Sequence, residues 1–215
     1  MLRIEGLDVS IGPVGILRDV DLAIDEAQFV GLIGRNGAGK TTLMRSVMGL
    51  LRCRRGSIIF DGHELTAQPA HQRAPLGIGY IPEDRRLIPS LTVQENLMLP
   101  MWATGASNAS SRLEKVYRIV PEALAFRERK GQQLSGGQQK LAALARALMC
   151  GTRLLLLDEP FEGVAPVLRQ RLVEVIAQLR GEGVSILLSD SSSAHTGTLL
   201  DRVYLIDRGA VHEAV

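Results

Sequence analysis

The spacing of hydrophobic residues changes character several times along the first fifty positions. Residues 2–9 and 17–24 alternate apolar and polar side chains, which predicts half-buried strands. Residues 29–33 form a continuous apolar run that ends in a glycine-rich turn, as a buried strand does. From residue 40 the apolar positions recur at spacings of three and four, which predicts an amphipathic helix. A strand, a glycine loop and a helix thus follow one another.

The rest of the chain divides into a helical middle and a second set of strands. The middle, residues 93–150, is mostly helical by its spacing, with breaks expected at Pro100, at residues 104–107, at Pro121 and at residues 130–131. Short apolar runs predict strands at residues 57–60, 78–81, 154–157, 184–188 and 203–206, the last being the final strand, and spacing predicts a helix over 167–179. This order predicts an α/β fold.

We expect one domain that spans residues 1–215, because this length suits a single core. Within it, residues 1–90 and 151–215 would form one doubly wound core, and residues 91–150 an inserted helical subdomain. The chain carries 25 Lys plus Arg and 23 Asp plus Glu, and this near balance gives no reason to expect nucleic acid as a partner. No apolar run reaches the length of a membrane-spanning helix or fits a secretory signal.

The glycine-rich turn after residues 29–33 matches the phosphate-loop pattern G-x-x-x-x-G-K-[ST]. Glycines let successive backbone N–H groups point at phosphate oxygens, and the following helix adds its positive N-terminal end. Lys40 can neutralise the β- and γ-phosphates, and the Thr41 hydroxyl can bind Mg²⁺. A bare match can arise by chance, but here a strand precedes it and a helix follows. The candidate phosphate-binding residues are Gly34, Arg35, Asn36, Gly37, Ala38, Gly39, Lys40, Thr41 and Thr42.

Two carboxylates, Asp158 and Glu159, follow the apolar run at residues 154–157. In an open parallel sheet, ligands collect at the carboxyl ends of the strands. Asp158 suits a Mg²⁺ contact, since hard cations prefer oxygen ligands, and Glu159 would polarise the attacking water. Taken alone, such a pair would be interpreted as solvated charges, so its interpretation depends on the phosphate loop.

A second glycine turn opens a predicted helix at Ser135, Gly136, Gly137 and Gln138. Ser135 is a natural N-cap, and the two glycines expose backbone N–H groups. An ordinary helix cap is one interpretation. The other is a second anion site, which either binds its own anion or completes a nucleotide site across a dimer.

These motifs, in this order and spacing, resemble the ATPases of ABC transporters. The resemblance covers almost the whole chain, and Leu134–Gln138 is its most specific part. It implies a P-loop core with a mainly parallel sheet, an N-terminal antiparallel β subdomain and an inserted helical subdomain. It also implies a head-to-tail dimer, homomeric or heteromeric, with ATP and Mg²⁺ between the Lys40 loop of one subunit and the Ser135 turn of the other.

A finer resemblance concerns residues 80–86, 91–97 and 158–166, which are similar to importers of branched-chain amino acids and of urea or short amides. It implies an ATPase on the cytoplasmic face of the membrane, docked on transmembrane permeases that a solute-binding protein supplies. The solute itself stays open, because that binding protein would select it. The resemblance also implies a chain somewhat longer than 215 residues.

Three positions depart from what the resemblance implies. Ile11 stands where an aromatic residue usually stacks on adenine, so burial would remain and ring stacking would be lost. Glu83 occupies the place of a Mg²⁺-contacting glutamine. Ser191 aligns with a histidine that contacts the γ-phosphate, and a serine can donate one hydrogen bond but carries no charge. His195 lies nearby as a weak substitute, and we expect slow but real hydrolysis.

Two functions stay open at this stage. The first is a transport ATPase whose helical subdomain touches the permease. The second is an ATP-binding subunit that hydrolyses poorly and acts as a regulatory partner, which Ile11 and Ser191 favour and Glu159 opposes. The apolar residues of the helical stretch could form the permease surface or pack in the core: Leu97, Leu99, Pro100, Met101 and Trp102.

Overall fold

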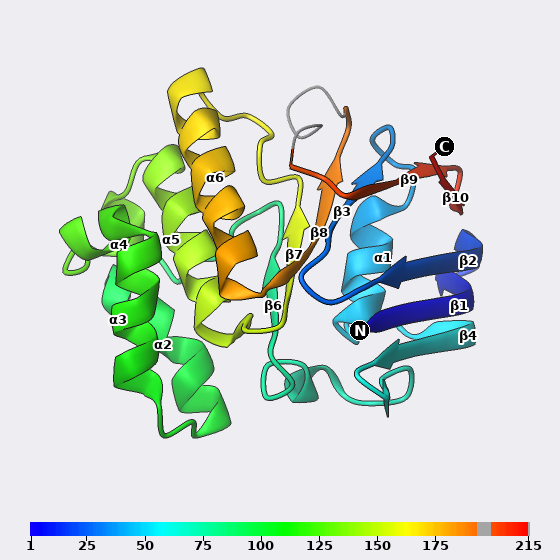
Figure 1. Cartoon of the computed structure of the whole chain (residues 1–215), viewed down its shortest axis with the longest axis horizontal. Coiled ribbons are helices and arrows are strands. Elements are labelled where there is room, and N and C mark those ends of the chain that lie inside the picture. The colour runs from blue at the N-terminus through cyan, green and yellow to red at the C-terminus, as the bar shows by residue number, and fades with distance from the viewer. Residues whose placement is uncertain (193–198, 215) are drawn as a thin grey trace.

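The computed structural model describes residues 1–192 and 199–214. Two sheets and six α-helices make up most of these residues, with three short 3₁₀ turns between them (Figure 1). In chain order the elements are β1 (Leu2–Ile11), β2 (Val14–Ile24), β3 (Phe29–Ile33), α1 (Lys40–Val47), β4 (Cys53–Phe60), β5 (His63–Glu64), η1 (Ala70–Gln72), β6 (Ile78–Ile81), α2 (Val93–Thr104), α3 (Ala109–Ile119), α4 (Pro121–Ala125), η2 (Gly131–Gln133), α5 (Gly136–Cys150), β7 (Leu154–Asp158), α6 (Pro166–Gln178), η3 (Leu179–Glu182), β8 (Ser185–Asp190), β9 (Arg202–Asp207) and β10 (Ala210–Glu213).

The central sheet has six strands in the order β10-β9-β3-β8-β7-β6. All neighbours from β9 to β6 are parallel, and only β10 runs antiparallel, beside β9. Because β3, β8 and β7 are adjacent and parallel, their carboxyl ends lie together at one edge of the sheet. The phosphate loop follows β3 and the two carboxylates close β7, so this edge collects the candidate site.

A second sheet, in the order β2-β1-β4-β5, is entirely antiparallel. Figure 1 shows it at the right of the molecule, next to α1. Residues of α1 share one hydrophobic cluster with β1 and β2 on one side and with β3 and β7 on the other. The helix that carries Lys40 and Thr41 is therefore packed between the two sheets.

Each face of the central sheet contributes side chains to a separate hydrophobic core, as the residues of β7 show. Its five residues are all buried. Leu154 and Leu156 belong to the cluster that contains α1, whereas Leu155 and Leu157 belong to the cluster formed with α5 and α6. Side chains of successive strand residues point to opposite faces, so an uninterrupted apolar run is what a doubly covered strand requires.

The helices α2 to α5 lie together at the left of Figure 1, where α2, α3 and α4 pack against α5. This arrangement and the two sheets confirm the predicted fold class, an α/β core with a mainly parallel sheet, an antiparallel β region and inserted helices. The residue boundaries drawn between a nucleotide-binding core and a helical subdomain stay a prediction.

Two local predictions were wrong. Pro100 does not break a helix but lies inside α2, whose hydrogen bonds resume beyond it up to the Gly105 cap. The strand at 203–206 is not the last, because β10 folds back on it through a turn at Gly209, where φ is +81°. Of the two arrangements left open for the apolar residues of α2, core packing holds for Leu97 and Met101, whereas Trp102 is 57% exposed.

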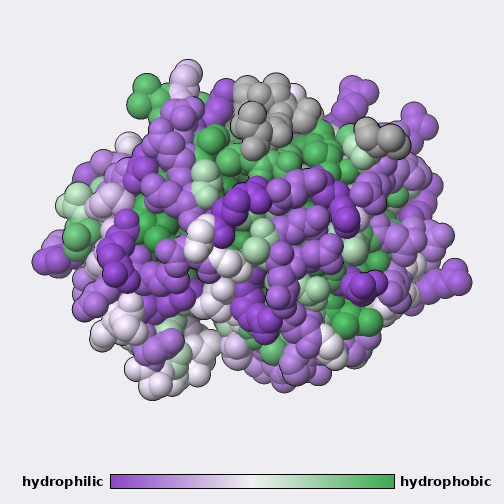
Figure 2. All heavy atoms as spheres, viewed as in Figure 1, coloured by the Kyte–Doolittle hydropathy of each residue, from purple (hydrophilic) through white to green (hydrophobic). Residues whose placement is uncertain are grey.

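In the space-filling view, hydrophilic side chains cover most of the visible face, and hydrophobic residues gather near its upper centre (Figure 2). Among the described residues, no helix combines the length and the apolar character needed to cross a bilayer.

Candidate active site

The loop between β3 and α1 closes over the end of the central sheet. The Gly34 N–H donates to the Asp190 carbonyl at 3.1 Å, which ties the loop to the end of β8. A Cβ at Gly34 would lie 2.2 Å from the Ile206 carbonyl oxygen, so only glycine fits there. Gly39, with φ of +116°, precedes α1 in a conformation that side chains rarely adopt. The first glycine of the motif thus serves close packing, and the last serves the turn into the helix.

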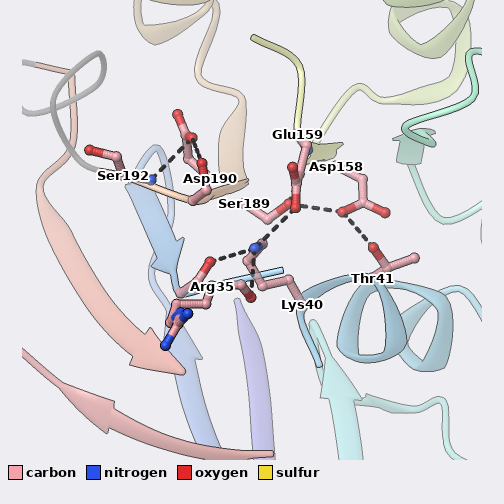
Figure 3. Close-up of polar contacts among 10 residues, drawn as sticks. Arg35, Lys40, Thr41, Asp158, Glu159, Ser189, Asp190 and Ser192 are labelled. Atoms are coloured by element: carbon pink, nitrogen blue, oxygen red, sulfur yellow. Dashed lines mark hydrogen bonds and ion pairs between the residues drawn. The ribbon is translucent and has the colours of Figure 1, made fainter. Parts of the chain in front are cut away.

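Lys40 is the first residue of α1, and only 3% of it is exposed. Its ammonium donates to the carbonyl of Gly34 and to the carbonyl of Arg35 at 3.2 Å, so the side chain curls back along its own loop. The same ammonium lies 3.0 Å from Glu159 Oε1, the tip of the residue after β7 (Figure 3). A buried cation thus faces a buried carboxylate across the edge of the sheet.

Asp158, the last residue of β7, is held from three sides. Its Oδ1 accepts hydrogen bonds from the Thr41 hydroxyl at 3.1 Å and from the Ser189 hydroxyl at 2.9 Å. Its Oδ2 accepts one from the Tyr80 hydroxyl at 3.2 Å. Burial raises the pKa of Asp158, and these hydrogen bonds counteract only part of that rise. The carboxylate is therefore fixed in place beside the first turn of α1.

Glu159 adopts a strained backbone conformation, with φ of +47°. Its N–H donates to the Ser189 hydroxyl at 3.0 Å, so one serine holds both acidic residues. Burial by itself would raise the pKa of Glu159, but its interactions with Glu162 and Lys40 outweigh burial and lower that pKa. Glu162 shows the opposite behaviour, since its pKa is raised by the neighbouring Glu159 carboxyl. Glu159 is thus the more easily ionised member of this pair.

The second glycine turn forms the predicted helix cap. The Ser135 hydroxyl accepts from the Gln138 N–H at 3.3 Å, and the Gln138 side chain accepts from the Ser135 N–H at 3.1 Å. The turn with Gly136 and Gly137 borders a hollow of about 460 Å³, whose lining includes Arg85 and Leu168. No phosphate-loop residue lines that hollow. Within the described chain, the Ser135 turn and the Lys40 loop are therefore separate sites.

The three departures noted in the sequence occupy different places. Ile11 ends β1 and is 49% exposed. Glu83 lies beside Thr41 and Asp158 on a hollow of about 230 Å³. Ser191 follows β8 and is exposed, with its hydroxyl 3.5 Å from Asp190 Oδ1. His195 lies outside the described residues.

Three side chains that contact the candidate site were not singled out by the sequence analysis: Tyr80, Lys140 and Ser189. Ser189 extends an apolar strand by one polar residue, and this pattern was visible but gave no hint of its two partners. Lys140 is 7% exposed, and burial, with Arg85 nearby, lowers its pKa. Its spacing of four and eight residues from Leu144 and Leu148 is the one signal in the sequence that could have indicated burial.

The donor set fits a nucleoside triphosphate with a hard divalent cation. The ammonium of Lys40 and the helix start suit phosphate oxygens, and Thr41, Asp158 and Glu83 offer oxygen atoms on one hollow. Among the described residues, no group of three or more His, Cys, Asp or Glu side chains could hold a metal by itself. A cation here would depend on phosphate oxygens and water for the rest of its ligands.

The sequence profile of the ABC transporter family matches residues 17–162. The chain is 36% identical to the high-affinity branched-chain amino acid transport ATP-binding protein BraG of Pseudomonas aeruginosa, over 98% of this chain and 91% of that protein. It is also 36% identical to the lipopolysaccharide export system ATP-binding protein LptB of Haemophilus influenzae, over 98% of this chain and 88% of that protein.

Solved structures agree with the sequence comparison. An ATP-binding subunit of an ABC transporter superposes with a TM-score of 0.87 at 29% identity, covering 100% of this chain and 90% of that one. A dimeric ATP-binding cassette with bound ADP and Pi reaches 0.88 at 24% identity, covering 100% and 98%, and this shows the shared fold. The family match, the relatives and the geometry at the sheet edge agree, and the chain belongs to the ABC transporter family as one of its ATP-binding, ATP-hydrolysing subunits.

Proposed function

We propose that ATP hydrolysis occurs at the carboxyl ends of β3, β7 and β8, with Glu159 as the group that polarises the attacking water. The observation that carries this proposal is the 3.0 Å contact between Lys40 Nζ and Glu159 Oε1. It joins the residue suited to the γ-phosphate and the residue suited to water activation at one point. The lowered pKa keeps Glu159 ionised and able to accept a proton at neutral pH.

The remaining residues would bind and orient the nucleotide. The backbone N–H groups from Gly34 to Thr42 would cradle the phosphates, and Lys40 would exchange its contact with Glu159 for phosphate oxygens. Thr41, Asp158 and Glu83 would hold Mg²⁺, which supplies charge neutralisation at the phosphates. Ile11, half exposed at the end of β1, would offer an aliphatic surface to the adenine.

We also infer an assembly of two such subunits. The Ser135 turn presents a capped helix start and two glycines on a hollow that lacks any phosphate-loop residue. A second subunit in head-to-tail orientation would bring its phosphate loop to this turn, and ATP would join the two. The pair would dock on transmembrane permeases and thereby lie at the cytoplasmic face of the membrane.

For the transported substrate we propose branched-chain amino acids or small solutes such as urea and short amides. The relative named for branched-chain amino acid transport and the similarity at residues 80–86 and 158–166 support this. An equally similar relative is named for lipopolysaccharide export, so export of a lipid is the second candidate.

The hydrolytic role is tested by Glu159→Gln. This variant keeps the size and the hydrogen bonding of the side chain and removes its basicity. We expect turnover of ATP to fall at least about a hundredfold while ATP affinity changes little, as when a general base is lost. The measurement is steady-state phosphate release together with nucleotide binding, for the chain alone and with its membrane partners. Unchanged turnover in the variant would show that Glu159 is not the base.

The substrate class is tested in cells that lack the chain and are complemented with wild type or with Glu159→Gln. Uptake of labelled leucine or urea that returns only with the wild type would support import. The export candidate would be favoured if the wild type restores the uptake of neither solute and lipopolysaccharide accumulates in the inner membrane of the Glu159→Gln cells.

A second candidate function is a regulatory subunit with weak hydrolysis, because Ser191 is exposed and uncharged at the position where the resemblance implies a histidine. Ser191→His is expected to raise turnover about tenfold if the missing donor limits the rate. ATP binding without turnover in any assembly, for the wild type and for Ser191→His, would favour regulation instead.

A further inference from the structure

Lys140 is a buried lysine of α5 whose ammonium donates its hydrogen bonds to backbone carbonyls. It donates to the carbonyls of Glu159 at 3.4 Å, Pro160 at 2.9 Å and Glu162 at 2.6 Å. An ammonium has three N–H donors, and here each of them finds one carbonyl. Among the described residues, no carboxylate lies within ion-pair distance of this nitrogen. The side chain therefore stabilises a backbone turn by hydrogen bonds instead of forming an ion pair with an acidic side chain.

The turn to which Lys140 donates carries the candidate catalytic carboxylate, that of Glu159. It spans residues 159–162 and is closed by the Glu162 N–H, which donates to the Glu159 carbonyl at 3.2 Å. Glu159 itself has φ of +47°, a conformation that a residue with a side chain keeps only when its surroundings enforce it. Ser189 holds the N–H of Glu159, and Lys140 holds its carbonyl. Each side of this strained residue is thus fixed by one side chain.

Lys140 is also joined to the Ser135 turn, because both belong to the start of the same helix. Lys140 lies in the second turn of the helix that Ser135 caps, and α5 is one continuous element with nine buried residues. The neighbouring Gln139 accepts a hydrogen bond from Arg85 at 3.1 Å, which ties the same helix start to the segment after β6. A displacement of the Ser135 turn would therefore move Lys140 with it.

We propose that Lys140 is a positioning residue that couples the Ser135 turn to Glu159 of the same subunit, so that engagement of the turn sets the geometry of water activation. This rests on the function proposed above for Glu159 and Ser135. Lys140 would act through the backbone carbonyls of residues 159–162 to which it donates.

The first test compares Lys140→Met with Lys115→Met. Methionine keeps an unbranched stem and removes the ammonium, and Lys115 supplies a matched control because its partner is Glu182, on η3. We expect Lys140→Met to lower kcat for ATP by about tenfold or more, as loss of a charge-assisted hydrogen bond would, while KM changes by less than about threefold. Lys115→Met should match the wild type. A Lys140→Met variant with normal kcat, or with equal losses of ATP affinity and thermal stability, would overturn the proposal.

The second test asks whether Lys140 acts through Glu159. The residual turnover of Glu159→Gln is compared with that of the double variant Lys140→Met with Glu159→Gln. If Lys140 only positions Glu159, the added substitution costs little, because the group that it positions is already inactive. A second loss as large as in the wild-type background would show an independent role and overturn the proposal.

A third measurement does not depend on turnover. Hydrogen exchange of the backbone amides of Glu159 and of residues 161–163 is followed in the wild type, Lys140→Met and Lys115→Met. We expect faster exchange only in Lys140→Met, because the turn loses the hydrogen bonds from the Lys140 ammonium. Unchanged exchange there would overturn the inference even if Glu159 proves catalytic, whereas absence of turnover in every variant would count against the proposed function and leave this readout decisive.

Discussion

At the scale of single residues, the site depends on a few side chains with more than one partner. The hydroxyl of Ser189 donates to Asp158 Oδ1 and accepts from the Glu159 N–H. The ammonium of Lys40 contacts two carbonyls and Glu159 Oε1. Such shared groups fix relative positions more tightly than isolated pairs do, because moving one partner disturbs the other.

Replacing Ser189 with Ala tests this sharing. The Glu159 N–H would lose its acceptor inside the protein, so we expect the free energy of unfolding to fall by about 1–3 kcal/mol. Turnover should fall about tenfold, since Asp158 and Glu159 would both lose a hydrogen bond that orients them. Denaturant unfolding and phosphate release measure the two effects.

Ser185→Ala is the matched control for this change. Ser185 is equally buried at the other end of β8, where its hydroxyl donates to the Asp25 carbonyl at 3.1 Å. It should lose stability and keep turnover. Equal turnover in the two variants would mean that Ser189 does not orient the carboxylates.

At the scale of elements, a polar junction holds the start of β9 against η3 and β3. Asp201 accepts from the Phe29 N–H at 2.8 Å and from the Arg180 guanidinium at 2.9 and 3.0 Å. Arg180 also donates to the Leu199 carbonyl and lies 4.4 Å from the centre of the Phe29 ring. Partial burial would raise the pKa of Asp201, but the Phe29 N–H and Arg180 outweigh burial and lower it.

This junction predicts a dependence of stability on pH. Since the folded pKa of Asp201 lies below the unfolded value, near about 3.9, its contribution is present above that value and is lost as pH falls through the folded pKa. Asp201→Asn should lower the free energy of unfolding by about 1 kcal/mol at pH 7, because the pair is partly exposed. The difference from the wild type should shrink below about pH 3.5. A difference that stays constant in urea titrations from pH 7 to pH 3 would contradict this assignment.

At the scale of the whole molecule, the central sheet separates two cores, and the candidate site lies where both meet the sheet edge. The α1 side holds the phosphate loop, and the α5–α6 side holds the Ser135 helix and Lys140. A ligand that contacts the end of the sheet therefore needs both cores in their native arrangement. Such a ligand binds the folded chain and not the unfolded one.

Nucleotide binding should accordingly raise the melting temperature. At ATP and Mg²⁺ concentrations about a hundred times Kd, linkage gives about 2.7 kcal/mol, which for a chain of this size corresponds to a shift of about 5–10 °C. Lys40→Ala should abolish most of that shift, because it removes the main cationic contact of the loop, and Lys115→Met should keep it. A full shift in Lys40→Ala, measured by differential scanning fluorimetry, would rule out the phosphate loop as the binding site.

The sequence by itself determined the elements and the residue types of the site. The apolar run at residues 154–157, the turn from Gly34 to Lys40 and the cap at Ser135 are local patterns, and local patterns follow from backbone sterics and periodicity. The errors were local too. Pro100 was predicted to end a helix, but the following residues of α2 continue it, and the fold-back at Gly209 was hidden by a short and polar final strand.

Only the tertiary structure decided which groups meet. Parallel pairing of β7 with β8 brings Ser189 to the carboxylates, and packing of α5 against the end of β7 buries Lys140 under the turn at residues 159–162. These contacts, and the one between Thr41 and Asp158, join residues 19 to 117 positions apart, which is beyond the reach of any local sequence pattern. Burial then sets the charges, because desolvation and the partners fixed by packing decide the pKa of Asp158 and of Glu159.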